Sequence, residues 1–148
     1  MIRLLGSRYE TGTAAFLVAL LRAAAGVVFV TIGTGKFVDH AAEVADFRHY
    51  GIPAPDVAVW LTGSVEVLCG LLLVVGLLTR PAAALLALTL VGAVSTAGRI
   101  DGGLFHLGVG PALLVVMLLL LWLGAGRPSV DSVLERRARG RRIGTSSA

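Results

Sequence analysis

The chain has 148 residues, of which 56% are hydrophobic and only 15% charged, and its mean hydropathy is +0.87. Soluble domains carry about a quarter charged residues, so this composition excludes an ordinary soluble fold and indicates an integral membrane protein. The net charge of +4 does not indicate nucleic-acid binding, because six of the thirteen basic residues lie in the last 22 positions rather than on a folded surface.

Four apolar segments follow one another along the chain, and each is long enough to cross a bilayer, which takes about 20 residues. We therefore predict an all-α integral membrane four-helix bundle over residues 14–123. A cytoplasmic N-terminal segment, 1–13, precedes this transmembrane domain, and a basic cytoplasmic tail, 124–148, follows it. The predicted spans are Ala14–Gly35, Val57–Leu78, Pro81–Ala97 and Leu104–Leu123.

Small residues recur within these spans and would allow helix backbones to approach closely. A GC-rich genome would also supply many alanines and glycines, so the pattern has two interpretations. The small residues in question are Gly26, Gly33, Gly63, Gly70, Ala83, Ala87, Gly92 and Ser95.

The connections between the spans differ in length. The loop from Lys36 to Asp56 has apolar residues at helical spacing, which predicts a short helix across the mouth of the bundle, with Asp39 as its candidate cap. The segment from Gly76 to Pro81 is a tight turn, so we expect the second and third spans to be antiparallel neighbours.

Basic residues are distributed unevenly between the two sides of this topology. Nine arginines fall on the side of the termini and only three basic residues on the other, so the positive-inside rule places both termini in the cytoplasm. This predicts a multi-pass protein of the bacterial inner (plasma) membrane. The arginines expected to lie against anionic lipids, in the turn and in the tail, are Arg80, Arg136, Arg137, Arg139, Arg141 and Arg142.

Arg22 and Glu66 each lie about nine residues into an apolar span, which is about 13 Å deep at 1.5 Å per residue. Charges at that depth are costly and are usually paired or functional. Because the two spans are antiparallel, we predict an Arg22–Glu66 ion pair. It has two interpretations: a structural pair that sets helix register, or the lining of a polar ligand pocket.

Three further residues are candidates for a site. Cys69 lies three positions after Glu66 and is either a small core residue or a reactive thiol. Lys36 and His106 fall at the outer mouth, where His106 begins the fourth span. The spacing of the histidines and carboxylates matches no metal signature, so we predict no metal site. The chain carries no autonomous catalytic motif, which leaves enzymatic activity open.

The strongest local pattern is Gly63-Ser64-Val65-Glu66-Val67-Leu68-Cys69-Gly70, followed by Gly76-Leu77-Leu78-Thr79-Arg80-Pro81. Together with Leu21-Arg22-Ala23 and Gly33-Thr34-Gly35-Lys36-Phe37, it resembles the DoxX family of small four-helix bacterial membrane proteins. That family is similar to the DoxD subunit of thiosulfate:quinone oxidoreductase. The resemblance marks Arg22, Lys36, Glu66 and Arg80 as recurring polar positions, without a catalytic role for any of them.

The resemblance implies a subunit or anchor of a membrane-associated redox complex, linked to quinone or thiol chemistry, with redox proteins as partners. A quinone is the candidate cofactor, and the candidate ligand-binding residues are Arg22, Lys36, Glu66, Cys69 and His106. Two alternatives remain: a non-catalytic scaffold that recruits partners, and a small-molecule transporter. Association of the protein with itself is a further expectation.

Overall fold

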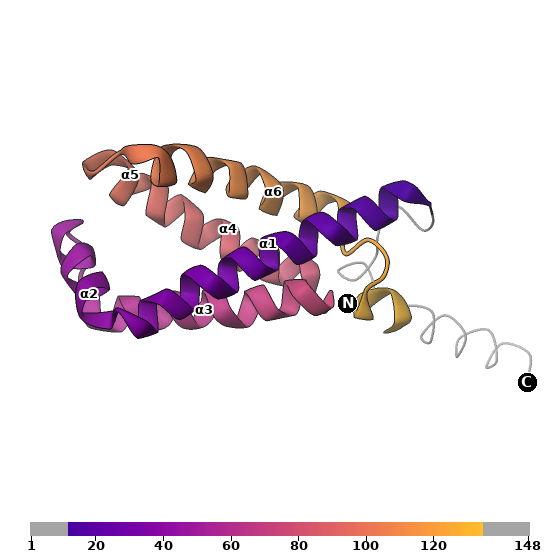
Figure 1. Ribbon diagram of the computed structural model, residues 1–148, viewed down its shortest axis with the longest axis horizontal. Helices are drawn as coiled ribbons and strands as arrows, with labels where there is room; N and C mark the ends of the chain where they lie inside the picture. Colours follow the sequence, from indigo (N-terminus) through magenta and orange to yellow (C-terminus); the bar gives the residue numbers. More distant parts are fainter. Residues whose placement is uncertain (1–11, 135–148) are drawn as a thin grey trace, which may run out of the picture.

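The computed structural model describes residues 12–134, and these residues form a bundle of helices without a strand (Figure 1). This confirms the predicted all-α fold. The elements in chain order are α1 (Thr13–Val38), α2 (His40–His49), α3 (Pro55–Val75), α4 (Thr79–Ser95), α5 (Ala97–Ile100), the π-helical segment η2 (Phe105–Val109) and α6 (Gly110–Leu123).

The length and the apolar composition of the long helices are suited to crossing a membrane. Three helical stretches, Thr13–Val38, Pro55–Val75 and Thr79–Ile100, are long and apolar enough to cross a bilayer, and a shorter apolar helix covers Leu107–Leu123. Large apolar side chains lie exposed on the outside of the bundle, as lipid contact requires. The helices cover the four predicted spans to within a few residues, while the limits of the membrane-embedded parts stay a prediction.

Helices α1 and α3 run antiparallel and make the most extensive contact in the described chain (Figure 1). Glycines form this contact. A Cβ atom on Gly26 would lie 2.7 Å from the carbonyl oxygen of Gly70, and one on Gly33 would lie 2.9 Å from the carbonyl oxygen of Gly63. Real Cβ atoms do not approach so closely, so only glycine permits this packing. The close approach predicted for these four glycines is confirmed.

The apolar core joins this pair to α4 and α6. Phe29, Leu73, Leu86, Met117 and Leu120 are almost fully buried where the four helices meet. The small residues Ala83 and Ala87 of α4 are buried in the same core, whereas a side chain on Gly92 would meet open space. The predicted small-residue packing is therefore wrong at Gly92.

The α3–α4 connection is tight, as predicted. Gly76, at the end of α3, has φ of +71°, and the non-glycine residue Leu78 has φ of +51° at the start of α4. These left-handed conformations reverse the chain within three residues, so α3 and α4 are antiparallel neighbours. Pro81 lies in the first turn of α4, where its missing N–H is not needed.

The short helix predicted between Lys36 and Asp56 forms as α2, at the end of the bundle that also holds α5 (Figure 1). Asp39 is its N-cap residue, but the Asp39 side chain makes no capping hydrogen bond. None of its residues is buried, so α2 is a surface element over the bundle end.

We predict that Gly70→Ala lowers the free energy of unfolding by about 1–3 kcal/mol, because the new methyl group would lie 2.8 Å from the backbone oxygen of Gly26. Thermal unfolding in mild detergent, followed by circular dichroism, measures this change. Gly92→Ala is the matched control, since its methyl group meets nothing within 4 Å. Equal stability of the two variants would contradict the close contact of α1 with α3.

Candidate functional site

A buried ion pair joins the two glycine-packed helices. Nζ of Lys36, on α1, lies 2.9 Å from Oε2 of Glu66, on α3, and the two side chains are 11% and 10% exposed. The glycines next to them bring the backbones together: a Cβ on Gly33 would lie 2.9 Å from Cβ of Glu66, and one on Gly63 would lie 3.3 Å from Cβ of Lys36. Close helix packing therefore places the ammonium and the carboxylate in contact.

The predicted Arg22–Glu66 ion pair is wrong. Glu66 pairs with Lys36, whereas Nη1 of Arg22 donates to the carbonyl oxygen of Leu73, at the end of α3. Leu73 is seven residues beyond Glu66, which is about 10 Å along a helix. The prediction measured depth from the helix starts, but the opposed glycines set a register in which Arg22 faces the end of α3.

The Lys36–Glu66 pair lines a cavity of about 700 Å³ between α1, α2, α3 and α4 that extends to α6. Its walls are mainly apolar, with a few hydroxyl and charged groups, and such a combination is typical of small-molecule sites of about 300–1,000 Å³. The apolar lining includes Phe29, Ile32, Phe47, Leu90 and Leu113. The polar lining comprises Thr31, Lys36, Glu43, Asp46, Tyr50, Thr62, Glu66, Thr89 and Thr96.

Helix α2 covers this cavity and is held at both ends. At its start, Nε2 of His40 lies 2.9 Å from Oδ1 of Asp56, and the His40 ring lies against Trp60. Just beyond its end, the hydroxyl of Tyr50 donates to Oδ2 of Asp101 at 2.6 Å. This hydrogen bond to a carboxylate raises the pKa of Tyr50 well above its ordinary value, so the phenol stays protonated and keeps the bond in alkaline as well as neutral solution.

Two of the other predicted ligand-binding residues do not line this cavity in the described part of the chain. Cys69 is 4% exposed and belongs to the apolar core, which favours its interpretation as a core residue. Arg22 lies at the opposite end of α1. The backbone of His106 is in η2, but its side chain lies outside what the structure describes.

Of the arginines predicted to contact lipid, Arg80 lies within the described residues. Nη2 of Arg80, in the first turn of α4, donates to the carbonyl oxygen of Trp122 at 3.3 Å, near the end of α6. Arg136, Arg137, Arg139, Arg141 and Arg142 lie outside the described residues. Among residues 12–134, no group of three or more metal-ligating side chains comes together.

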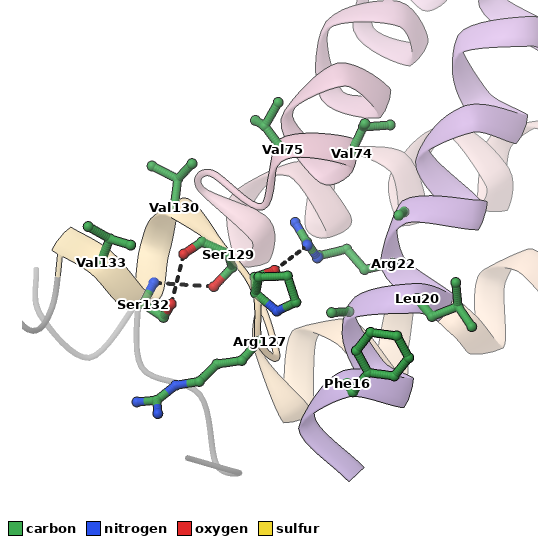
Figure 2. Close-up of a pocket in the computed structure, with 13 residues that line it drawn as sticks. Phe16, Leu20, Arg22, Val74, Val75, Arg127, Ser129, Val130, Ser132 and Val133 are labelled. Atoms are coloured by element: carbon green, nitrogen blue, oxygen red, sulfur yellow. Dashed lines mark hydrogen bonds between the residues drawn. The ribbon is translucent and has the colours of Figure 1, made fainter. Parts of the chain in front are cut away.

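A second polar cluster lies at the Arg22 end of the bundle. Nη2 of Arg22 donates to the carbonyl oxygen of Pro128 at 2.9 Å (Figure 2). Asp131 is 1% exposed and accepts hydrogen bonds from the backbone N–H groups of Leu78 and Thr79, at 2.9 and 3.1 Å. It thus satisfies the free N–H groups at the start of α4. Asp131 could not be identified as a site residue from the sequence, since nothing there links it to a turn 52 residues away.

The comparison with protein-family models gives one match, to DoxX, over residues 17–99. The "Uncharacterized membrane protein Rv3486" of Mycobacterium tuberculosis is 36% identical over 135 residues, covering 82% of this chain and 83% of that protein. The "Putative oxidoreductase CatD" of Bacillus subtilis is 33% identical over 88 residues, covering 60% of each chain. No solved structure gives a significant match.

We predict that Glu66→Met alone lowers the free energy of unfolding by about 3–5 kcal/mol, because it leaves the Lys36 ammonium buried without its partner. Adding Lys36→Met should restore stability to within about 1 kcal/mol of the parent protein, since an apolar pair then replaces the ion pair. Unfolding temperatures in mild detergent measure both changes. The matched control combines Glu66→Met with Arg22→Met in place of Lys36→Met, and this second substitution should not restore stability. Rescue by Arg22→Met would contradict the Lys36–Glu66 pairing.

Proposed function

The chain belongs to the DoxX family of membrane proteins, and on that premise we propose that it is a membrane subunit or anchor of a redox complex that holds a quinone-like ligand. The observation that carries this proposal is the buried Lys36–Glu66 ion pair in the wall of a largely apolar cavity. The name of the Bacillus subtilis relative, which refers to an oxidoreductase, supports the redox setting.

The groups in the cavity fit the chemistry of a quinone. A quinone has an apolar ring and two carbonyl oxygens, and it reaches a membrane protein from the bilayer. Phe29, Ile32 and Leu90 supply apolar contacts for a ring, and the Lys36 ammonium is a donor for a carbonyl oxygen. When bound, such a group would accept and release electrons for a partner enzyme.

The ion pair would have two tasks in this proposal. Glu66 holds the Lys36 ammonium in place and offsets its charge, so that the ammonium remains available inside an apolar site. Lys36 would then stabilise negative charge that develops on a ligand oxygen during reduction. The carboxylate of Glu66 is also placed to accept or return a proton beside that oxygen. The electrons for the reduction would come from a partner protein.

The proposed setting is the bacterial inner membrane, with both termini in the cytoplasm. The excess of arginine at the termini and at the α3–α4 turn supports this orientation. The cavity and α2 then lie toward the outer side of the membrane. The basic tail beyond residue 134 would contact anionic lipid headgroups, and self-association remains part of the proposal.

We predict that a short-chain quinone, ubiquinone-1, binds the purified full chain in lipid nanodiscs and that Lys36→Met with Glu66→Met weakens this binding at least about tenfold. Each lost charge-assisted hydrogen bond is worth about 1.5–3 kcal/mol, which is a factor of ten or more. Isothermal titration calorimetry measures the affinity. We expect the double variant to keep a folded bundle, and its unfolding temperature checks this, so that a loss of binding reports on the ligand rather than on stability.

A pair of threonine variants provides a matched control. Thr62 lines the cavity and Thr34 does not, yet each hydroxyl donates to the backbone oxygen four residues earlier on its own helix. Thr62→Val should weaken ubiquinone-1 binding, and Thr34→Val should leave it unchanged. Equal affinities in the parent protein and in the folded Lys36/Glu66 double variant would overturn the proposed site.

A further inference from the structure

A second cavity, of about 1060 Å³, lies at the opposite end of the bundle from the Lys36–Glu66 pair. It is bounded by the first half of α1, the end of α3 and the segment 127–133 (Figure 2). We propose that this cavity binds an anionic phospholipid, with the phosphate group near Arg127 and Arg22 and an acyl chain along α1 and α3. This site is distinct both from the proposed quinone site and from the basic tail beyond residue 134.

The charge of the cavity suits an anionic headgroup. Two arginines, Arg22 and Arg127, line the cavity. The nearby carboxylate of Asp131 offsets Arg22 in part, but both of its oxygens already accept backbone N–H groups of the α3–α4 turn. Among residues 12–134, the lining includes these two arginines and no carboxylate, so this part of the wall carries a net positive charge. Basic pockets between membrane helices on the cytoplasmic side are suited to anionic headgroups.

Arg22 carries a buried N–H group without a hydrogen-bond partner among the described residues. The side chain of Arg22 enters this region from α1, and the residue is 3% exposed (Figure 2). Its Nη1 and Nη2 atoms donate to the carbonyl oxygens of Leu73 and Pro128, but its Nε–H has no partner in the described structure. A buried donor without an acceptor is costly, and a phosphate oxygen is an acceptor of the right kind.

The apolar part of the lining suits an acyl chain. Phe16, Leu20 and Val75 border the cavity and are each more than half exposed, at 57%, 57% and 51%. They belong to the membrane-facing surfaces of α1 and α3. A small hydrophilic anion would leave these side chains uncovered, whereas an acyl chain would cover them. The combination of arginines with exposed apolar side chains in one lining therefore points to a phospholipid rather than to free phosphate.

Native mass spectrometry of the full chain in mild detergent tests this inference, with phosphatidylglycerol and phosphatidylcholine of identical acyl chains as probes. We expect phosphatidylglycerol to bind at least about fivefold more tightly. Arg127→Gln should reduce that preference about fivefold, as expected for one arginine near a headgroup. Arg99→Gln is the matched control, because Arg99 is exposed on α5 at the other end of the bundle. The basic tail is intact in both variants, so its contribution is the same.

A pair of bulky substitutions tests the position of the acyl chain. Ala23 lines the cavity, whereas the next residue, Ala24, is exposed and does not. Ala23→Trp should therefore reduce phosphatidylglycerol binding severalfold, and Ala24→Trp should not. Circular dichroism melts of all four variants establish that each is folded.

Four results would overturn the inference. Equal binding of the two lipids would leave only an apolar groove without headgroup recognition. The lipid would lie elsewhere if Arg127→Gln and Arg99→Gln changed phosphatidylglycerol binding equally. The same conclusion would follow if Ala23→Trp and Ala24→Trp reduced that binding equally. Displacement of phosphatidylglycerol by millimolar glycerol phosphate would assign the site to a free anion instead.

Discussion

The contact of α1 with α3 through four glycines determines where the polar groups of this protein lie. Because Gly26 faces Gly70 and Gly33 faces Gly63, the two backbones approach to a distance that any side chain would prevent. The same register brings Lys36 to Glu66 at one end of the pair. At the other end it directs Arg22 to the carbonyl oxygen of Leu73. A shift of one helical turn would separate both sets of partners, so packing and electrostatics specify the same arrangement.

The result is a bundle with different chemistry at its two ends. At one end, a neutralised ion pair lies beside an apolar cavity under α2, which suits an uncharged ligand with carbonyl oxygens. At the other end, Arg22 and Asp131 connect the segment after α6 to α1 and to the α3–α4 turn, beside a cavity of positive charge. The apolar core around Leu86 and Met117 joins α4 and α6 to the α1–α3 pair between these two ends. This separation supports independent functions for the two sites.

Hydrophobic periodicity and composition were sufficient to predict the fold class, the three long helices, the shorter apolar helix that follows them and the short helix of the first loop. The packing glycines were also predictable, apart from Gly92. The pairing of Glu66 was not predicted correctly, because counting from the helix starts assumes that α1 and α3 begin at equal distances from the middle of the bundle, on opposite sides of it. The heptad spacing of the glycines already implied the observed register, in which Arg22 faces the end of α3. The role of Asp131 could not be predicted, since it depends on a long-range contact with the start of α4.

Photoaffinity labelling is the most direct test of the cavity beside Lys36 and Glu66. The full chain in lipid nanodiscs would be irradiated with an azido-quinone, and the labelled residues would be located by peptide mass spectrometry. We predict labelling concentrated on the cavity lining of α2, α3 and α4, such as Phe47, Thr62 and Thr89, and its loss in the variant with Lys36→Met and Glu66→Met. Labelling spread over the lipid-facing surface of the bundle, unchanged in that variant, would contradict the proposed quinone site.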